Sequence, residues 1–236
     1  MRRLLVINPN TTAAVSRLLE ESARGVVPHL QVRVVTARFG APYIGCEASY
    51  AIAAHAVLDA WAAESADGEP DAVLVGCFGD PGLLALREAG VAATGLACAA
   101  AEEAARHGGF AIVTGGARWD PMLRRLMHDL GFADALRGIH TLEASGLQLA
   151  QDPEGTRRLL AQACRDAARR FGASAVVIGG AALAGLAERV QPELDVPVID
   201  SVAAGLRQVD LLATRAQAGQ PTRREEIWAW LSGPRG

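Results

Sequence analysis

The chain has 236 residues, of which 50% are hydrophobic and 21% charged, and its formal net charge is −3 at pH 7. This length and composition are typical of a globular protein with one domain or two small lobes. The weak negative charge and the scattered arginines exclude a basic nucleic-acid surface, and no apolar run approaches the roughly 20 residues of a membrane helix.

Apolar runs and turn formers predict an alternation of strands and helices along the whole chain. We expect strands at residues 3–7, 31–36, 72–75, 91–95, 110–114, 138–142, 175–178 and 196–200. We expect a first helix that Asn10 or Thr11 caps, and further helices at residues 49–61, 83–88, 98–107, 122–130, 153–170, 201–212 and 225–231. The last of these helices is expected to pack Trp228 and Trp230.

The segment VLVGCFGDPGL, residues 73–83, carries the first candidate for a reactive side chain. Its apolar run predicts a strand buried on both faces of a parallel sheet, and Cys77 follows at the carboxyl end, where α/β proteins bind ligands. Asp80 and Pro81 are expected to cap and begin the next helix. Free backbone N–H groups and a helix end favour a thiolate, so Cys77 is a candidate nucleophile or acid/base. The alternative is a buried structural cysteine.

A second copy of this segment lies in the other half of the chain. AVVIGGAALAGL, residues 175–186, aligns without a gap with AVLVGCFGDPGL, residues 72–83. In this alignment Cys77 falls on Gly180. The strands at 91–95 and 196–200 also correspond, since both lead into alanine-rich helices.

The duplication predicts an α/β protein of two pseudo-symmetric lobes, each a mostly parallel sheet flanked by helices. We assign residues 1–97 together with 201–236 to the first lobe and residues 98–200 to the second. Strand ends from both lobes are expected to face one cleft, which is the predicted active site.

The composition also limits the cofactors. The four cysteines are widely spaced and the histidines are dispersed, so we expect no metal site and a reducing, cytoplasmic location. All 23 basic residues are arginine, and without lysine a pyridoxal-phosphate Schiff base is impossible. The loop at residues 8–12 has neither G-x-G-x-x-G nor a Walker lysine, so no nucleotide is expected.

Six segments, in this order and spacing, resemble the aspartate/glutamate/hydantoin racemase superfamily, most closely its hydantoin and allantoin racemase branch. They are INPNTT, FGAPYIG, VGCFGDPGL, VTGGARW, VIGGAALAGLAE and VPVID, and the resemblance spans about residues 4–206. It implies two pseudo-symmetric lobes, no cofactor, and one cysteine from each lobe on opposite faces of the α-carbon of the substrate.

By position, the resemblance implies that Cys77 is one acid/base of the reaction. The oxyanion donors that it implies are the backbone N–H groups of Phe78, Gly79, Gly180 and Ala181. The further side chains that it places in the cleft are Asn10, Tyr43 and Thr114.

Two positions depart from the family pattern. Gly180 stands where hydantoin racemases carry the second cysteine, and Cys98 stands where the family usually has a glutamate. A relative, arylmalonate decarboxylase, works with one cysteine and a glycine in the other position.

Three functions therefore remain open. The first is a racemase-type enzyme that uses Cys77 alone or with Cys46 as a displaced partner. The second is a single-cysteine decarboxylase, and the third is a non-catalytic small-molecule binder. We expect a small-molecule substrate (an amino acid, a hydantoin or a related compound), no nucleic-acid or membrane partner, and a homo-oligomer.

Overall fold

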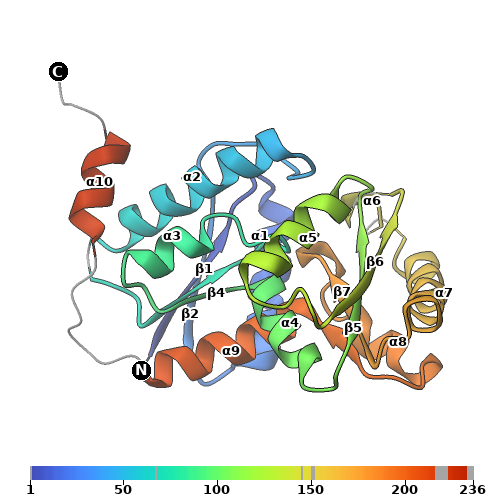
Figure 1. The fold of residues 1–236 in the computed structure, drawn as a ribbon. Coiled ribbons are helices and arrows are strands. Elements are labelled where there is room, and N and C mark those ends of the chain that lie inside the picture. The colour runs from blue at the N-terminus through green and yellow to red at the C-terminus, as the bar shows by residue number, and fades with distance from the viewer. Residues whose placement is uncertain (1, 67, 145, 150–151, 216–222, 233–236) are drawn as a thin grey trace.

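The strands divide between two sheets, one in each half of the chain (Figure 1). The structure is a computed structural model that describes residues 2–66, 68–144, 146–149, 152–215 and 223–232. The first sheet has the order β2-β1-β3-β4 and contains β1 (Arg3–Asn8), β2 (Gln31–Thr36), β3 (Ala72–Val75) and β4 (Ala93–Gly95). The second has the order β6-β5-β7-β8 and contains β5 (Phe110–Gly115), β6 (Leu136–Leu142), β7 (Ala175–Gly179) and β8 (Val198–Asp200).

All the described pairings between neighbouring strands are parallel. The helices of the first half are α1 (Ala13–Val26), α2 (Glu47–Glu64), α3 (Leu83–Glu88) and α4 (Leu96–Ala105). Those of the second half are α5 (Trp119–Asp129), α6 (Gly146–Leu149), α7 (Pro153–Phe171), α8 (Leu186–Val190), α9 (Ser201–Arg215) and α10 (Arg224–Ser232), with short 3-10 turns at Ala181–Leu183 and Gln191–Glu193. The predicted α/β fold of two similar lobes is confirmed.

The duplication extends to the backbone conformation of matching residues. Gly82 is the N-cap of α3 with φ +78°, and Gly185 is the N-cap of α8 with φ +79°. Both angles lie in the left-handed region that glycine adopts without a steric penalty. The two loops that follow β3 and β7 therefore turn into their helices in the same way.

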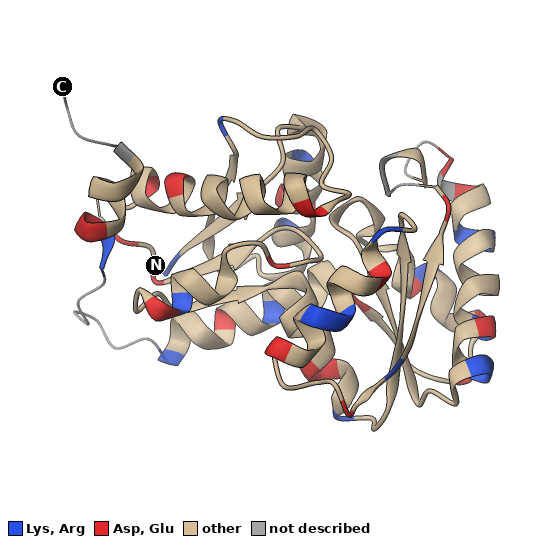
Figure 2. Cartoon of the chain, turned by 45° about the horizontal axis from the view of Figure 1, so that its top comes forward, with Lys and Arg blue, Asp and Glu red and all other residues tan. Residues whose placement is uncertain are grey.

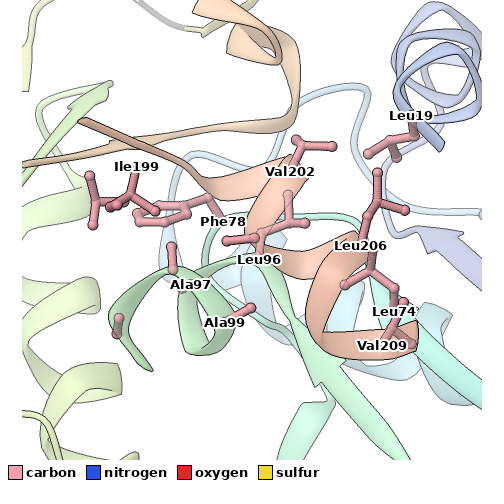
Figure 3. Close-up of a cluster of buried hydrophobic side chains, with 14 of the residues drawn as sticks. Leu19, Leu74, Phe78, Leu96, Ala97, Ala99, Ile199, Val202, Leu206 and Val209 are labelled. Carbon is pink, nitrogen blue, oxygen red and sulfur yellow. The ribbon is translucent and has the colours of Figure 1, made fainter. Parts of the chain in front are cut away.

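One hydrophobic core joins the two lobes. Leu96 of α4 and Leu206 of α9 lie against the first sheet, while Phe78 points toward Ile199 of β8 in the second (Figure 3). The helices α4 and α9 lie between the sheets, where they bury apolar side chains against both (Figure 1). This shared core limits relative motion of the lobes. The lobe boundaries at residues 97 and 200 stay a prediction.

Charged residues occur on the outside of both lobes, while Asp59 and Asp80 are buried. In the view of Figure 2, acidic and basic residues are spread over both lobes and do not form a cluster of one charge. None of the helices within the described ranges is long and apolar enough to cross a membrane. The expected packing of Trp230 was wrong, because its side chain is 63% exposed and lies beside the Arg223 guanidinium, whereas Trp228 packs partly against the first lobe.

Candidate active site

The carboxyl ends of the central strands β1, β3, β5 and β7 meet around one cavity. Its empty volume is about 550 Å³, a figure that includes the part open to solvent. Its lining consists of Asn10, Val15, Tyr43, Ile44, Gly76, Cys77, Phe78, Thr114, Gly115, Trp119, Gly179, Gly180, Ala181 and Ala182. The structure thus brings seven of the eight predicted site residues together, and Gly79 is the one outside this lining.

Cys77 enters the cavity directly after the buried strand β3. The residue keeps partial exposure, but burial of its thiol raises the pKa well above the ordinary value, and the negative charge of Asp80 raises it further. This shift works against the thiolate that the sequence led us to expect. The helix α3, which we expected to begin at Pro81, begins only at Leu83, farther from the sulfur along the chain.

Two of the four predicted backbone donors are already bonded within the protein. The Gly79 N–H donates to the Cys77 carbonyl oxygen at 3.0 Å, and the Gly180 N–H donates to Ser201 Oγ at 3.3 Å. The N–H groups of Phe78 and Ala181 donate to no other described residue. Both residues, one from each lobe, line the cavity.

Phe78 bridges the two lobes beside the thiol. A Cβ atom added at Gly179 would lie 2.2 Å from the Phe78 ring, so the glycine is what allows the ring to cross onto β7. Thr114 Oγ1 donates to the Gly179 carbonyl oxygen at 2.8 Å and fixes the end of that strand. Thr114 is therefore a structural support of the cavity wall as well as part of its lining.

Trp119 is a cavity residue that the sequence did not identify. It is 5% exposed, and its ring lies over Gly79, where an added Cβ atom would approach the ring to 2.5 Å. The residue belongs to the segment VTGGARW that carries the family resemblance, which was the available signal. Gly79 serves to make room for this ring rather than to line the cavity.

The loop between β2 and α2 closes one side of the cavity. Tyr43 Oη donates to the Gly115 carbonyl oxygen of the other lobe at 3.4 Å, and Thr12 Oγ1 donates to the Pro42 carbonyl oxygen at 2.7 Å. The expected cap of α1 was wrong, because Thr12 is the N-cap and Asn10 Oδ1 instead accepts the Thr12 N–H at 2.8 Å. The Asn10 Nδ2 group remains as a donor beside the cavity.

Comparison with known proteins agrees with this geometry. The Asp/Glu/Hydantoin racemase family matches residues 4–209. The chain belongs to this family. It is 31% identical to a hydantoin racemase from Rhizobium meliloti over 232 residues, covering 95% of this chain and 93% of the relative.

Two solved structures of other proteins have the same architecture. Allantoin racemase from Klebsiella pneumoniae superimposes with a TM-score of 0.85 at 33% identity and covers 100% of this chain and 95% of its own. Arylmalonate decarboxylase superimposes with a TM-score of 0.64 at 20% identity, covering 94% of this chain and 95% of its own, and is similar in fold.

Cys46, the other half-buried thiol, is not among the residues that line the racemase-family cavity. It is the N-cap of α2, and its sulfur lies 3.4 Å from Ser49 Oγ. The hydrogen bond from Ser49 lowers the pKa of Cys46, because it stabilises the thiolate. Next to it, the Glu47 carboxylate accepts two hydrogen bonds from Arg125 of the other lobe, at 2.7 and 3.0 Å.

Asp80 does not cap α3, as the sequence led us to expect. Its carboxylate instead accepts the N–H groups of Ala97 at 2.9 Å and Cys98 at 2.7 Å, at the start of α4. The side chain is 2% exposed. Burial raises its pKa to about 7, although the two hydrogen bonds from Ala97 and Cys98 act in the opposite direction. A buried carboxyl group thus lies three residues beyond the cavity thiol.

Proposed function

We propose that this protein is a cofactor-independent enzyme that moves a proton at the carbon next to a carbonyl group of a small molecule, with Cys77 as its acid/base. The observation that carries this proposal is the thiol at the end of β3, in a cavity whose lining includes one residue from each lobe with an unbonded backbone N–H, Phe78 and Ala181. Removing such a proton places negative charge on the carbonyl oxygen. Fixed donors in a site with little water stabilise that charge strongly.

The lining favours a neutral substrate over an amino acid. None of the lining residues carries a charged side chain, and most are apolar or glycine. An amino acid would bring an ammonium and a carboxylate group into this cavity without counter-charges, which is costly. A five-membered ring amide of the hydantoin type is neutral and offers carbonyl oxygens to the N–H groups of Phe78 and Ala181. Its ring substituent would contact apolar surface such as Ile44 and Trp119.

In the proposed step, the Cys77 thiol first gives up its proton to solvent, and the thiolate so formed takes the proton from the α-carbon. The electron pair of the broken C–H bond moves onto the carbonyl oxygen, where the free N–H groups and Asn10 Nδ2 hold it. Return of a proton to the carbon completes the cycle. Inversion requires that this proton arrive on the opposite face, where position 180 offers only glycine and water must supply it.

A second candidate reaction for the same site is decarboxylation, in which Cys77 protonates one face of the enolate that remains after carbon dioxide has left. The raised pKa of Cys77 keeps its proton at neutral pH, which suits a proton donor better than a base. In that reaction the bond to a carboxylate breaks, its electron pair forms the enolate, carbon dioxide leaves, and the Cys77 S–H proton goes to the carbon. The glycine at position 180 favours this candidate as well.

Proton exchange in D₂O distinguishes these reactions. We expect the protein to catalyse exchange at the α-carbon of a 5-substituted hydantoin, observed by NMR, and to leave aspartate unchanged. Exchange with retention indicates one working base, exchange with inversion indicates two, and carbon dioxide release from an arylmalonate identifies the second reaction. Cys77→Ser should abolish whichever activity is found.

Cys46→Ser is the matched control, because this thiol is also half-buried but does not line the cavity. It should retain full activity. If the hydantoin and the arylmalonate are both unchanged by the wild-type protein, or if Cys77→Ser retains turnover, the proposed function is wrong. Small-molecule binding without turnover would then identify a non-catalytic binder.

A further inference from the structure

The buried carboxylate of Asp80 occupies an unfavourable position. Asp80 has φ +50°, and no other non-glycine residue among those described has a positive φ. A non-glycine residue in the left-handed region costs stability, and so does burying a carboxylate. Gly95 accommodates this arrangement, because a Cβ atom there would lie 2.2 Å from Asp80 Cγ.

Capping α4 does not by itself explain this placement. The corresponding helix α9, which follows the last strand of the second sheet, is also capped by a carboxylate, that of Asp200, which accepts the N–H groups of Val202 at 2.9 Å and Ala203 at 3.0 Å. Asp200 is half-buried, has no positive φ, and stands at the end of β8, in the position that matches Gly95. The position that matches Asp80 is Leu183.

The two lobes therefore solve the same capping problem in opposite ways. In the lobe without a cavity cysteine, the carboxylate belongs to the last strand. In the lobe with Cys77, it belongs to the turn that carries the thiol, and the Asp80 N–H also donates to the Cys77 carbonyl oxygen at 3.1 Å. The less favourable arrangement occurs where a thiol adjoins it.

We propose that Asp80 is a positioning residue of the active site, whose carboxylate fixes the Cys77 turn onto the start of α4. Its negative charge also favours the protonated form of the neighbouring thiol. This inference rests on the proposed role of Cys77. The charge of Asp80 thus makes Cys77 a proton donor in the resting enzyme. The thiol proton is transferred only after the substrate is bound.

The groups around Asp80 come from α2, α3, α4 and its own turn. Tyr50 of α2 has a pKa raised to about 12 by burial, and burial also raises the pKa of Cys98 of α4, so both stay neutral near pH 7. Arg87 of α3 donates to Cys98 Sγ at 3.3 Å, and its positive charge favours ionised Asp80. Asp80 is thus the neighbour of Cys77 that changes charge near neutral pH, with a pKa of about 7.

The rate at which iodoacetamide alkylates Cys77, measured by mass spectrometry of the Cys77 peptide from pH 5.5 to 9, tests the proposal. Below about pH 6 the wild type and Asp80→Asn should react at similar rates, because Asp80 is then uncharged in the wild type. Above about pH 8 the variant should react roughly tenfold faster, which corresponds to one pKa unit. The wild-type rate should accordingly rise less steeply with pH between these values.

Asp200→Asn is the matched control, since it removes the equivalent helix cap in the lobe without the thiol. Its Cys77 rate should follow the wild-type curve at every pH. Curves for Asp80→Asn and the wild type that differ by a constant factor would indicate a merely structural cap and overturn the proposal. If Asp80→Asn does not fold, a wild-type rate that rises tenfold per pH unit throughout overturns it equally. Alkylation requires no turnover, so absence of the proposed activity would not affect this test.

Discussion

Replacing Gly180 by cysteine tests whether the two lobes present acid/base positions to opposite faces of one substrate. Gly180 has φ +140° and ψ 128°, a conformation that side chains rarely adopt. The space itself is open, since the nearest side-chain atoms to an added Cβ are those of Leu183 at 3.6 Å. The cost of Gly180→Cys therefore comes from the backbone and should be about 1–3 kcal/mol of unfolding free energy.

Gly180→Cys should increase the rate at which the protein inverts the α-carbon of a hydantoin. A positioned general acid or base contributes roughly 10²- to 10⁴-fold, so a thiol at position 180 should increase the rate of hydantoin inversion by up to that factor over the wild type. Chiral chromatography of a single hydantoin enantiomer in D₂O measures inversion and exchange together. The variant should shift the product from exchange with retention toward exchange with inversion.

Gly180→Ala is the control, because it carries the same backbone strain without a thiol. It should lose the same stability in urea denaturation and gain no inversion. If Gly180→Cys folds and inverts the hydantoin no faster than Gly180→Ala, position 180 does not face the substrate opposite Cys77. Rapid inversion by the wild type would point to a second acid/base elsewhere.

Two further predictions concern stability. Gly79→Ala should destabilise the protein by about 1–3 kcal/mol in urea titration, because the new Cβ would lie 2.5 Å from the Trp119 ring. Gly25→Ala is the control: this residue lies in α1 with nothing within 4 Å, so the substitution should be neutral or stabilising. Equal effects of the two substitutions would contradict the packing role of Gly79. The second prediction concerns pH. The Asp80 carboxyl ionises at a pKa of about 7 in the folded protein and near 3.8 in the unfolded chain, so between about pH 4 and 7 the folded state binds more protons. The unfolding free energy should therefore fall as pH rises through this range. Asp80→Asn should lack this part of the decrease, and an identical pH dependence of the two proteins would refute the assignment.

The sequence alone determined the fold class and most of the cavity wall. Strands such as β3 are short apolar runs between turn formers, and that pattern is local, so it can be recognised without tertiary contacts. The match between residues 72–83 and 175–186 then indicated two similar lobes. Because Cys77 and Gly180 occupy matching strand ends of the two lobes, and ligands of α/β proteins bind at such strand ends, both could be assigned to one cleft from sequence.

Only the tertiary structure decided the chemical state of that cleft. Whether Cys77 is a thiol or a thiolate depends on burial and on the charge of Asp80, and neither is visible in a local pattern. Asp80 looked like the cap of the helix next to it, but its carboxylate reaches the start of α4, 17 and 18 residues along the chain, because folding brings that helix end close and Gly95 leaves room. Trp119 likewise joins the cavity through its contact with Gly79 in the other lobe, which exists only once the lobes have packed together.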